Sequence, residues 1–224
     1  MQPPNQALQN VLQTLENAAA AAKRPVPRLL AVSKTKPPEA VRALAAEGQT
    51  AFGENYVQEA VAKIQALREL GLEWHFIGQL QTNKCREVAE HFDWLQSLDR
   101  ARLIAPLDRF RAGHAPLQVL IQVNPDGEAG KSGCAPQDIA ALAESIARAP
   151  NLCLRGLMAI PEPTPDMEQR RATFRRLHDA FQALRQQYPQ ADTLSMGMSE
   201  DFALAVAEGS TMVRIGTALF GRRG

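Results

Sequence analysis

The chain repeats one pattern along its length. A short aliphatic or aromatic run is followed by a turn and then by a segment with helical periodicity. Short apolar runs that are bounded by polar, glycine or proline positions are typical of buried β-strands. The runs cover residues 28–34, 50–55, 74–78, 94–98, 117–124, 154–161, 193–199 and 212–221. The pattern therefore predicts eight strands.

The segments between these runs predict helices that each bury one face. After the sixth run, apolar residues recur at spacings of 3, 4, 3 and 4, as on one side of a helix. They are Phe174, Leu177, Phe181, Leu184 and Tyr188. After the second run, a helical segment ends before Gly71, a residue type common just past helix ends. A further helix over residues 5–23 precedes the first strand.

Strands that alternate with helices predict a parallel sheet with both faces covered. Eight such units predict a (β/α)8 TIM-type barrel with an additional N-terminal helix. The alternative is a doubly wound open sheet, which usually has a glycine-rich phosphate loop after its first strand. The first run ends in Ser33-Lys34-Thr35 without that loop, so the barrel is favoured, with residues 1–224 as a single domain.

The composition argues against several classes of protein. The 25 Lys and Arg against 24 Asp and Glu leave a net charge of +1, which indicates neither nucleic acid nor a membrane surface as partner. Three cysteines without CxxC or Cys/His spacing argue against a disulfide framework and a zinc site. The N-terminus does not resemble a signal peptide, and no apolar run is long enough to span a bilayer. We expect a cytoplasmic protein with reduced thiols.

The first strand ends in a lysine, Lys34. In barrels, functional residues gather at the C-terminal ends of the strands. Partial desolvation there would lower the pKa of Lys34, and a neutral amine can condense with an aldehyde to form a Schiff base. The alternative is a lysine that simply extends from a strand end into solvent.

Residues near the last two strands predict a phosphate site. Ser199 stands at the start of a predicted helix, where free N–H groups favour anions, although it could also be a plain N-cap. Gly216 and Thr217 follow at the end of the eighth run, and the loops after strands seven and eight commonly hold phosphate in barrels. With Lys34, these residues predict a pocket for a phosphorylated aldehyde.

Arg214 lies two residues before Gly216, so both positions point to the same side of the strand. If that side is the barrel interior, the guanidinium needs a partner. A ring nitrogen of a ligand and a carboxylate of the barrel both remain open.

Several long segments of this chain, in this order, resemble one known family. They are "LLAVSKTKP", "FGENYVQE", "WHFIG" with "LQTNK", "KSG", "RGLMAIP", "LSMGMSEDF" and "STMVRIGTALFG". Together they resemble the pyridoxal 5′-phosphate (PLP) homeostasis proteins, which bind PLP on the barrel fold of alanine racemase. In "HFIGQLQTNK", Gln79 stands where that family often has proline.

The resemblance implies a set of cofactor contacts. It implies that Lys34 holds PLP as a Schiff base and that Arg214 meets the pyridine nitrogen. It implies that the phosphate is held by Ser199, Gly216 and Thr217. Further pocket positions are implied at Asn55, His75 and Met158. Whether Lys36 or Lys131 forms a second PLP site stays open.

The resemblance implies a carrier that holds PLP and supplies it to PLP-dependent apoenzymes, without catalytic turnover and as a monomer. The alternative is a PLP-dependent amino-acid racemase, which needs a base on each face of the substrate carbanion. The second base of alanine racemase comes from another domain, and we expect this chain, which ends at Gly224, to lack it. A third interpretation is a lyase or aldolase that uses Lys34 on sugar phosphates, which predicts a colourless protein.

Overall fold

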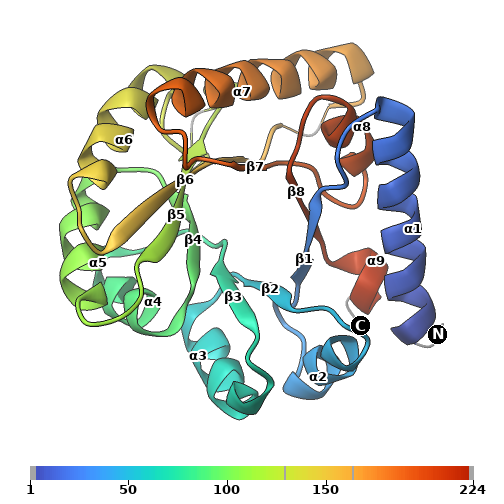
Figure 1. Ribbon diagram of the computed structural model, residues 1–224, viewed down its shortest axis with the longest axis horizontal. Coiled ribbons are helices and arrows are strands. Elements are labelled where there is room, and N and C mark those ends of the chain that lie inside the picture. The colour runs from blue at the N-terminus through green and yellow to red at the C-terminus, as the bar shows by residue number, and fades with distance from the viewer. Residues whose placement is uncertain (1–3, 129, 163, 222–224) are drawn as a thin grey trace.

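Eight parallel strands close into a barrel in the computed structural model, which describes residues 4–128, 130–162 and 164–221 (Figure 1). The strands follow one another in chain order, and β1 pairs with both β2 and β8. Their bounds are β1 Arg28–Val32, β2 Ala51–Glu54, β3 Glu73–Phe76, β4 Trp94–Leu98, β5 Leu117–Val123, β6 Leu152–Ala159, β7 Thr193–Ser195 and β8 Met212–Ile215. This closure confirms the predicted barrel and excludes the open sheet.

Helices surround the barrel, and the predicted N-terminal helix packs beside the last two helices (Figure 1). The α-helices are α1 Pro4–Ala22, α2 Pro38–Ala46, α3 Val57–Ala66, α4 Cys85–His91, α5 Ile104–Arg111, α6 Ile139–Ala147, α7 Met167–Gln187, α8 Phe202–Ala207 and α9 Thr217–Phe220. Short 3₁₀ turns are η1 Arg68–Leu70, η2 Thr82–Lys84, η3 Ala101–Leu103 and η4 Pro136–Asp138. Within the described ranges, no helix combines the length and apolarity needed to cross a membrane.

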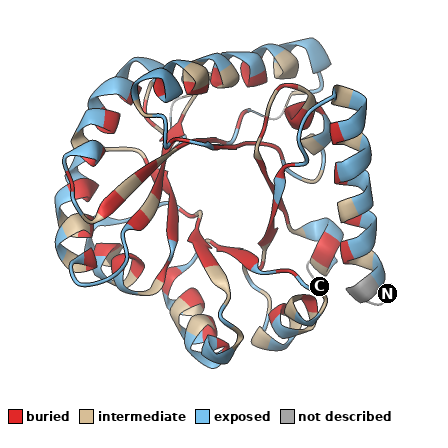
Figure 2. Ribbon diagram, in the orientation of Figure 1, coloured by how far each residue is buried: buried red, intermediate tan, exposed pale blue. Residues whose placement is uncertain are grey.

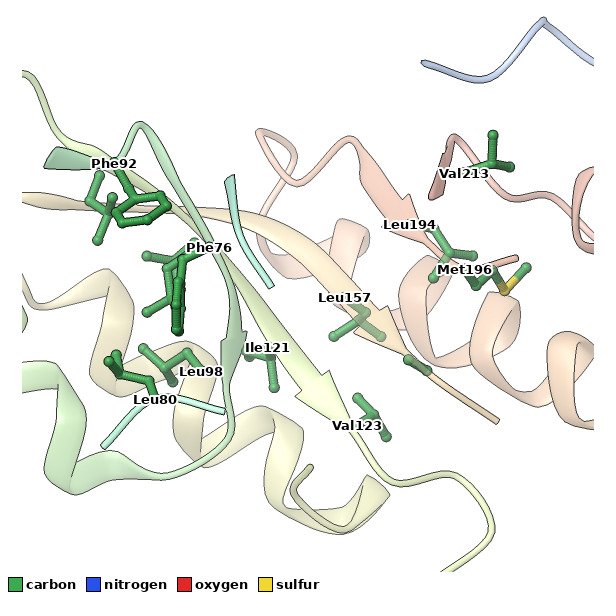
Figure 3. Close-up of a cluster of buried hydrophobic side chains, with 14 of the residues drawn as sticks. Phe76, Leu80, Phe92, Leu98, Ile121, Val123, Leu157, Leu194, Met196 and Val213 are labelled. Atoms are coloured by element: carbon green, nitrogen blue, oxygen red, sulfur yellow. The ribbon is translucent and has the colours of Figure 1, made fainter. Parts of the chain in front are cut away.

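The main hydrophobic core lies between the strands and the helices. Buried positions cover the strands and the inward faces of the helices (Figure 2). Figure 3 shows part of this layer, in which the rings of Phe76 and Phe92 meet edge to face with centroids 5.4 Å apart. The predicted apolar face of α7 is confirmed, because Phe174, Phe181 and their neighbours on that face are buried.

Several strands end earlier than the apolar runs predicted. β1 stops at Val32, because the chain turns with Lys36 N–H donating to Ser33 O and Thr35 at a φ of 62°. β8 stops at Ile215, because the next residue, Gly216, is the N-cap of the short helix α9. The polar residues that follow these strands therefore lie on turns, where alternation of side chains along a strand no longer fixes their direction.

The N-terminal end of the barrel is filled by charged and aromatic side chains. The Arg155 and Arg28 guanidinium groups lie 5.1 Å and 6.0 Å from the Trp94 ring centroid. Arg28 also pairs with Glu73 at 2.7 Å, and Arg155 pairs with Asp192. The polar residues expected to form a site lie at the opposite, C-terminal end.

Candidate functional site

A cavity of about 380 Å³ opens where the strands end. Its walls are formed by residues that follow β1, β2, β3, β6, β7 and β8. Six of the eight residues predicted for the site line it: Lys34, Asn55, Ser199, Arg214, Gly216 and Thr217. An adjoining cavity of about 570 Å³ shares four of these residues and adds Lys36. The structure therefore brings together positions that are up to 183 residues apart in sequence, from Lys34 to Thr217.

Lys34 lies on the turn between β1 and α2 and is partly exposed toward both cavities. Among the described residues, no hydrogen bond or ion pair holds its amine. Lys36, its nearest competitor, lines only the second of the two cavities and donates to Phe220 O at 3.2 Å. Of these two lysines, Lys34 is thus the one that lines both cavities.

A buried ion pair lies directly behind this turn. Lys63 Nζ lies 2.5 Å from the Glu54 carboxylate and donates to Ser33 O at 2.9 Å. The Ser33 hydroxyl donates to the same Glu54 oxygen at 2.6 Å. Burial raises the pKa of Glu54, although the hydrogen bonds and charge of Lys63 oppose this. The backbone on the N-terminal side of Lys34 is therefore anchored to α3.

The other side of the turn is anchored by Glu59. The Thr35 N–H donates to the Glu59 carboxylate at 2.7 Å, and Lys63 lies 3.1 Å from the same carboxylate. Ser33 and Thr35 are thus held by one cluster on both sides of Lys34. Sequence reasoning missed this cluster, although a glutamate at the end of the apolar run "AFGE" was a signal that a buried carboxylate needed a partner.

Arg214 forms the floor of the cavity and is 4% exposed. Its Nη1 donates to the carbonyl and hydroxyl of Ser195, both at 2.8 Å, and its Nη2 donates to Ala159 O at 2.9 Å. Burial lowers its pKa to about 10, opposed by the charge of Asp201. Of the two partners left open from sequence, a barrel carboxylate makes no ion pair with Arg214 in the described part of the chain.

The predicted phosphate residues meet at one side of the cavity, with one correction. Ser199 lies in the turn before α8, whose N-cap is Asp201, so it is neither the start of that helix nor its cap. The Asp201 carboxylate instead accepts from Met198 N–H at 2.7 Å. Thr217 is the first residue of α9, and Gly216 precedes it. In α9 the N–H groups of Leu219 and Phe220 donate to Gly216 O, so the donors that its start offers to this wall are the N–H groups of Thr217 and Ala218.

Asn55 presents a polar atom that the protein leaves unused. Its side-chain oxygen is buried and finds no hydrogen-bond partner among the described residues. The backbone there is tightly packed, since a Cβ atom on Gly78 would lie 2.1 Å from Asn55 O. Gln79, the position that departs from the family pattern, follows Gly78 and is exposed. The departure therefore leaves the close contact between Gly78 and Asn55 in place.

His75 and Met158 do not line either cavity, contrary to the interpretation from sequence. Both are fully buried inside the barrel, below the cavity. His75 stacks on Trp94 with ring centroids 5.1 Å apart, and Met158 packs with Trp94 and Leu120. His75 lies within β3, and Met158 is the penultimate residue of β6, so both belong to the packed interior of the barrel. Sequence reasoning also missed three acidic residues of the cavity wall, Glu162, Glu200 and Asp201.

Comparison with known proteins places this architecture in a family. The profile of the family described as alanine racemase, N-terminal domain, matches residues 6–224. A pyridoxal phosphate homeostasis protein of Pasteurella multocida is 52% identical over 97% of this chain and 97% of its own length. The protein of the same name from Vibrio cholerae is 57% identical over 88% of this chain and 85% of its own length.

Solved structures of similar proteins share this barrel fold. PipY of Synechococcus elongatus, with PLP bound, is 39% identical, with a TM-score of 0.80 over 92% of this chain and 100% of PipY. Alanine racemase from Corynebacterium glutamicum is 20% identical, with a TM-score of 0.69 over 97% of this chain and 61% of the racemase, which shows the shared fold alone. The chain belongs to the alanine racemase N-terminal domain family and, within it, to the pyridoxal phosphate homeostasis proteins.

Proposed function

We propose that this protein binds PLP in the cavity at the C-terminal end of the barrel and holds it for intracellular vitamin B6 homeostasis. One observation carries the proposal: Lys34, Arg214 and the wall formed by Ser199, Gly216 and Thr217 line a single cavity. The names of the close relatives and the PLP-bound structure of PipY support it. The cavity volume falls within the range of small-molecule sites.

The residues present fit the chemistry of this ligand. Bound PLP supplies an aldehyde, which a neutral lysine amine can capture with the loss of one water molecule. Lys34 would provide that amine, while Ser199, Thr217 and the first N–H groups of α9 would hold the phosphate. Asn55 contributes the unused acceptor, which a ligand donor in the cavity would satisfy.

Arg214 would face the pyridine nitrogen of the ligand. A guanidinium group only donates hydrogen bonds, so it favours an unprotonated ring nitrogen. An unprotonated ring stabilises a carbanion poorly, but alanine racemase shares this arginine, so Arg214 alone does not separate a carrier from a racemase. The names of the close relatives favour the carrier. The resemblance to amino-acid racemases, at 20% identity, extends to the fold. We therefore include in the proposal a monomeric, cytoplasmic protein that supplies PLP to recipient apoenzymes.

The test is spectroscopic. Purified protein with added PLP should absorb visible light, and borohydride reduction should fix the cofactor on Lys34, as located by peptide mapping. Lys34→Ala should lose the band, whereas Lys36→Ala and Lys131→Ala should keep most of it. A protein that stays colourless with PLP, or a band unchanged in Lys34→Ala, would refute the proposed site. The colourless result would favour a lyase or aldolase.

A further inference from the structure

His75 lies outside the cavity, yet a chain of hydrogen bonds connects it to Arg214. The Arg214 guanidinium donates to Ser195 Oγ at 2.8 Å, and that hydroxyl lies 2.7 Å from Gln96 Oε1. Gln96 Nε2 lies 2.9 Å from His75 Nδ1, and His75 Nε2 lies 2.7 Å from the Glu73 carboxylate. We call the side chains of Ser195, Gln96, His75 and Glu73 the barrel column. The column runs through the barrel interior from the cavity floor toward the N-terminal end.

All the hydrogen bonds from Arg214 to Glu73 can donate in the same direction along the barrel column. Arginine can only donate, so Ser195 Oγ accepts and gives its own proton to Gln96 Oε1. The Gln96 amide then donates to Nδ1 of His75, which fixes the neutral His75 tautomer with its proton on Nε2. That proton points to Glu73, which as a carboxylate can only accept. Hydrogen bonds that share one direction strengthen one another, and the orientation of each group depends on the next.

The column is buried except where it ends. Ser195, Gln96 and His75 are each 0% exposed, while Glu73 is partly exposed and paired with Arg28 at 2.7 Å. Burial lowers the pKa of His75, opposed by Glu73 and Asp93, while Arg28 adds to the lowering. For Glu73, the hydrogen bonds from His75 and Arg28 and the positive charge of Arg28 oppose the effect of burial and lower the pKa. The neutral histidine and ionised glutamate that the geometry requires are thus both favoured.

Arg214 depends on this arrangement more than an ordinary buried arginine does. Its other protein acceptors are two backbone carbonyls, those of Ser195 and Ala159. The Ser195 hydroxyl can rotate, and a rotated hydroxyl would point its proton at the guanidinium group. Gln96 prevents this by accepting that proton. The Gln96 amide therefore fixes the Ser195 hydroxyl. The His75 ring, which bonds to Glu73, fixes the Gln96 amide.

We propose that Glu73, His75 and Gln96 are positioning residues for Arg214, acting through Ser195 from the opposite end of the barrel. They fix the orientation of the guanidinium group at the cavity floor before any ligand binds. The inference rests on the proposed function only in taking PLP as the ligand that Arg214 faces. The column itself is a property of the protein alone.

The first arm of the test uses the protein without ligand. Ring ¹⁵N NMR of His75 should show the neutral tautomer with its proton on Nε2 in the wild type at pH 7.5. Arg214→Met and Ser195→Ala should each shift the His75 ring resonances, although neither residue touches the ring. The matched control is Gln122→Leu, because Gln122 is a buried glutamine of β5 that bonds to Ser132 O outside the column. Gln122→Leu should leave the ring resonances in place.

The second arm measures PLP binding. Gln96→Leu and Ser195→Ala should each weaken PLP binding by about tenfold, equal to about 1.4 kcal/mol, while Gln122→Leu changes it less than about twofold. Ser195→Ala removes a single oxygen and keeps the carbonyl acceptor, so it tests the column even if Gln96→Leu fails to fold. A proton on Nδ1, unchanged His75 resonances in Arg214→Met, or an equal loss in Gln122→Leu would overturn the inference. If the wild type binds no PLP, the proposed function fails, and the ligand-free spectra still decide the column.

Discussion

Two of the buried cations in the described part of the chain lie beside the candidate site, and their surroundings differ. Lys63 is 2% exposed and Arg214 is 4% exposed. Lys63 lies outside the barrel wall, within 3.1 Å of two carboxylates, Glu54 and Glu59. Arg214 lies inside the wall, and its hydrogen bonds go to neutral oxygens of Ser195 and Ala159.

The difference distinguishes Lys63, which stabilises the fold, from Arg214, which is placed to bind a ligand. A buried charge is costly unless it is paired and hydrogen-bonded. The charge of Lys63 is neutralised within the protein, and its role is to hold the turn of Lys34. The charge of Arg214 is held in place but not neutralised, so an electron-rich ligand atom in the cavity can complete its environment. Arg111 also bonds only to backbone carbonyls while buried, so what sets Arg214 apart is its place in the cavity that Lys34 lines.

The largest effect should come from breaking the pair. Glu54→Gln should lower the free energy of unfolding by about 3–5 kcal/mol, because it leaves Lys63 buried beside a neutral group. The double variant Glu54→Leu with Lys63→Met should recover most of that loss, since it removes both charges. Urea unfolding of the single and double variants measures the coupling. A loss below about 1 kcal/mol in Glu54→Gln would show that the buried Lys63, like Arg214, does not depend on a carboxylate partner, which would contradict the comparison.

Arg214→Met should affect PLP binding more than stability, whereas Glu54→Gln should mainly affect stability. Because it removes a charge that lacks a carboxylate partner, the free energy of unfolding should change less than in Glu54→Gln. PLP binding should weaken by about 1.5–3 kcal/mol, the usual value of a hydrogen bond to a charged group. Urea unfolding and PLP titration of the same preparation test both statements. A variant that unfolds easily but binds PLP normally would contradict the comparison.

The sequence predicted the barrel well because its evidence is local. Strands and helices are indicated by the spacing of apolar residues within a short segment, as in the apolar face of α7 from Phe174 to Leu184. The strand ends were less well predicted: the first and last runs were drawn to residues 34 and 221, whereas β1 ends at Val32 and β8 at Ile215, where the backbone turns.

The sequence predicted six residues that line the cavity, including Arg214 at its floor, but it did not show that His75 lies outside it. Alternation along β3 shows that His75 faces inward but not how deep it lies. Its depth follows from the closure of the barrel, which stacks it on Trp94. The partners that give His75 its role, Gln96 and Glu73, come from β4 and from the first residue of β3, and neither position suggested a site by itself. The column is a property of the assembled barrel.

The column also predicts how stability depends on pH. The pKa of His75 is lowered below its ordinary value of 6.5 by burial, so the folded protein binds fewer protons than the unfolded chain as pH falls below that value. The free energy of unfolding should therefore decrease from pH 7 to pH 5, by up to about 1.4 kcal/mol per pH unit from this group. The loss from Glu73 begins at lower pH, as its pKa of about 2 lies below its ordinary value of 4.5. His75→Gln should flatten the slope between pH 7 and pH 5 in urea unfolding, and equal slopes would mean that His75 titrates normally.

The smallest effect concerns two buried cysteines, Cys85 and Cys134, which show how burial alters the pKa of a thiol that forms no ion pair. Burial raises the pKa of Cys85 to about 11 and that of Cys134 to about 12, so both thiols stay neutral at neutral pH. At pH 8 only about one Cys85 in a thousand carries the reactive thiolate. Cys153 is partly exposed, so iodoacetamide should modify it first in the folded protein, as read by peptide mass spectrometry. Urea-unfolded protein, in which all three thiols should react, is the control. Fast modification of Cys134 in the folded state would show that the wall between β5 and its following loop opens in solution, and that burial there is weaker than around Arg214.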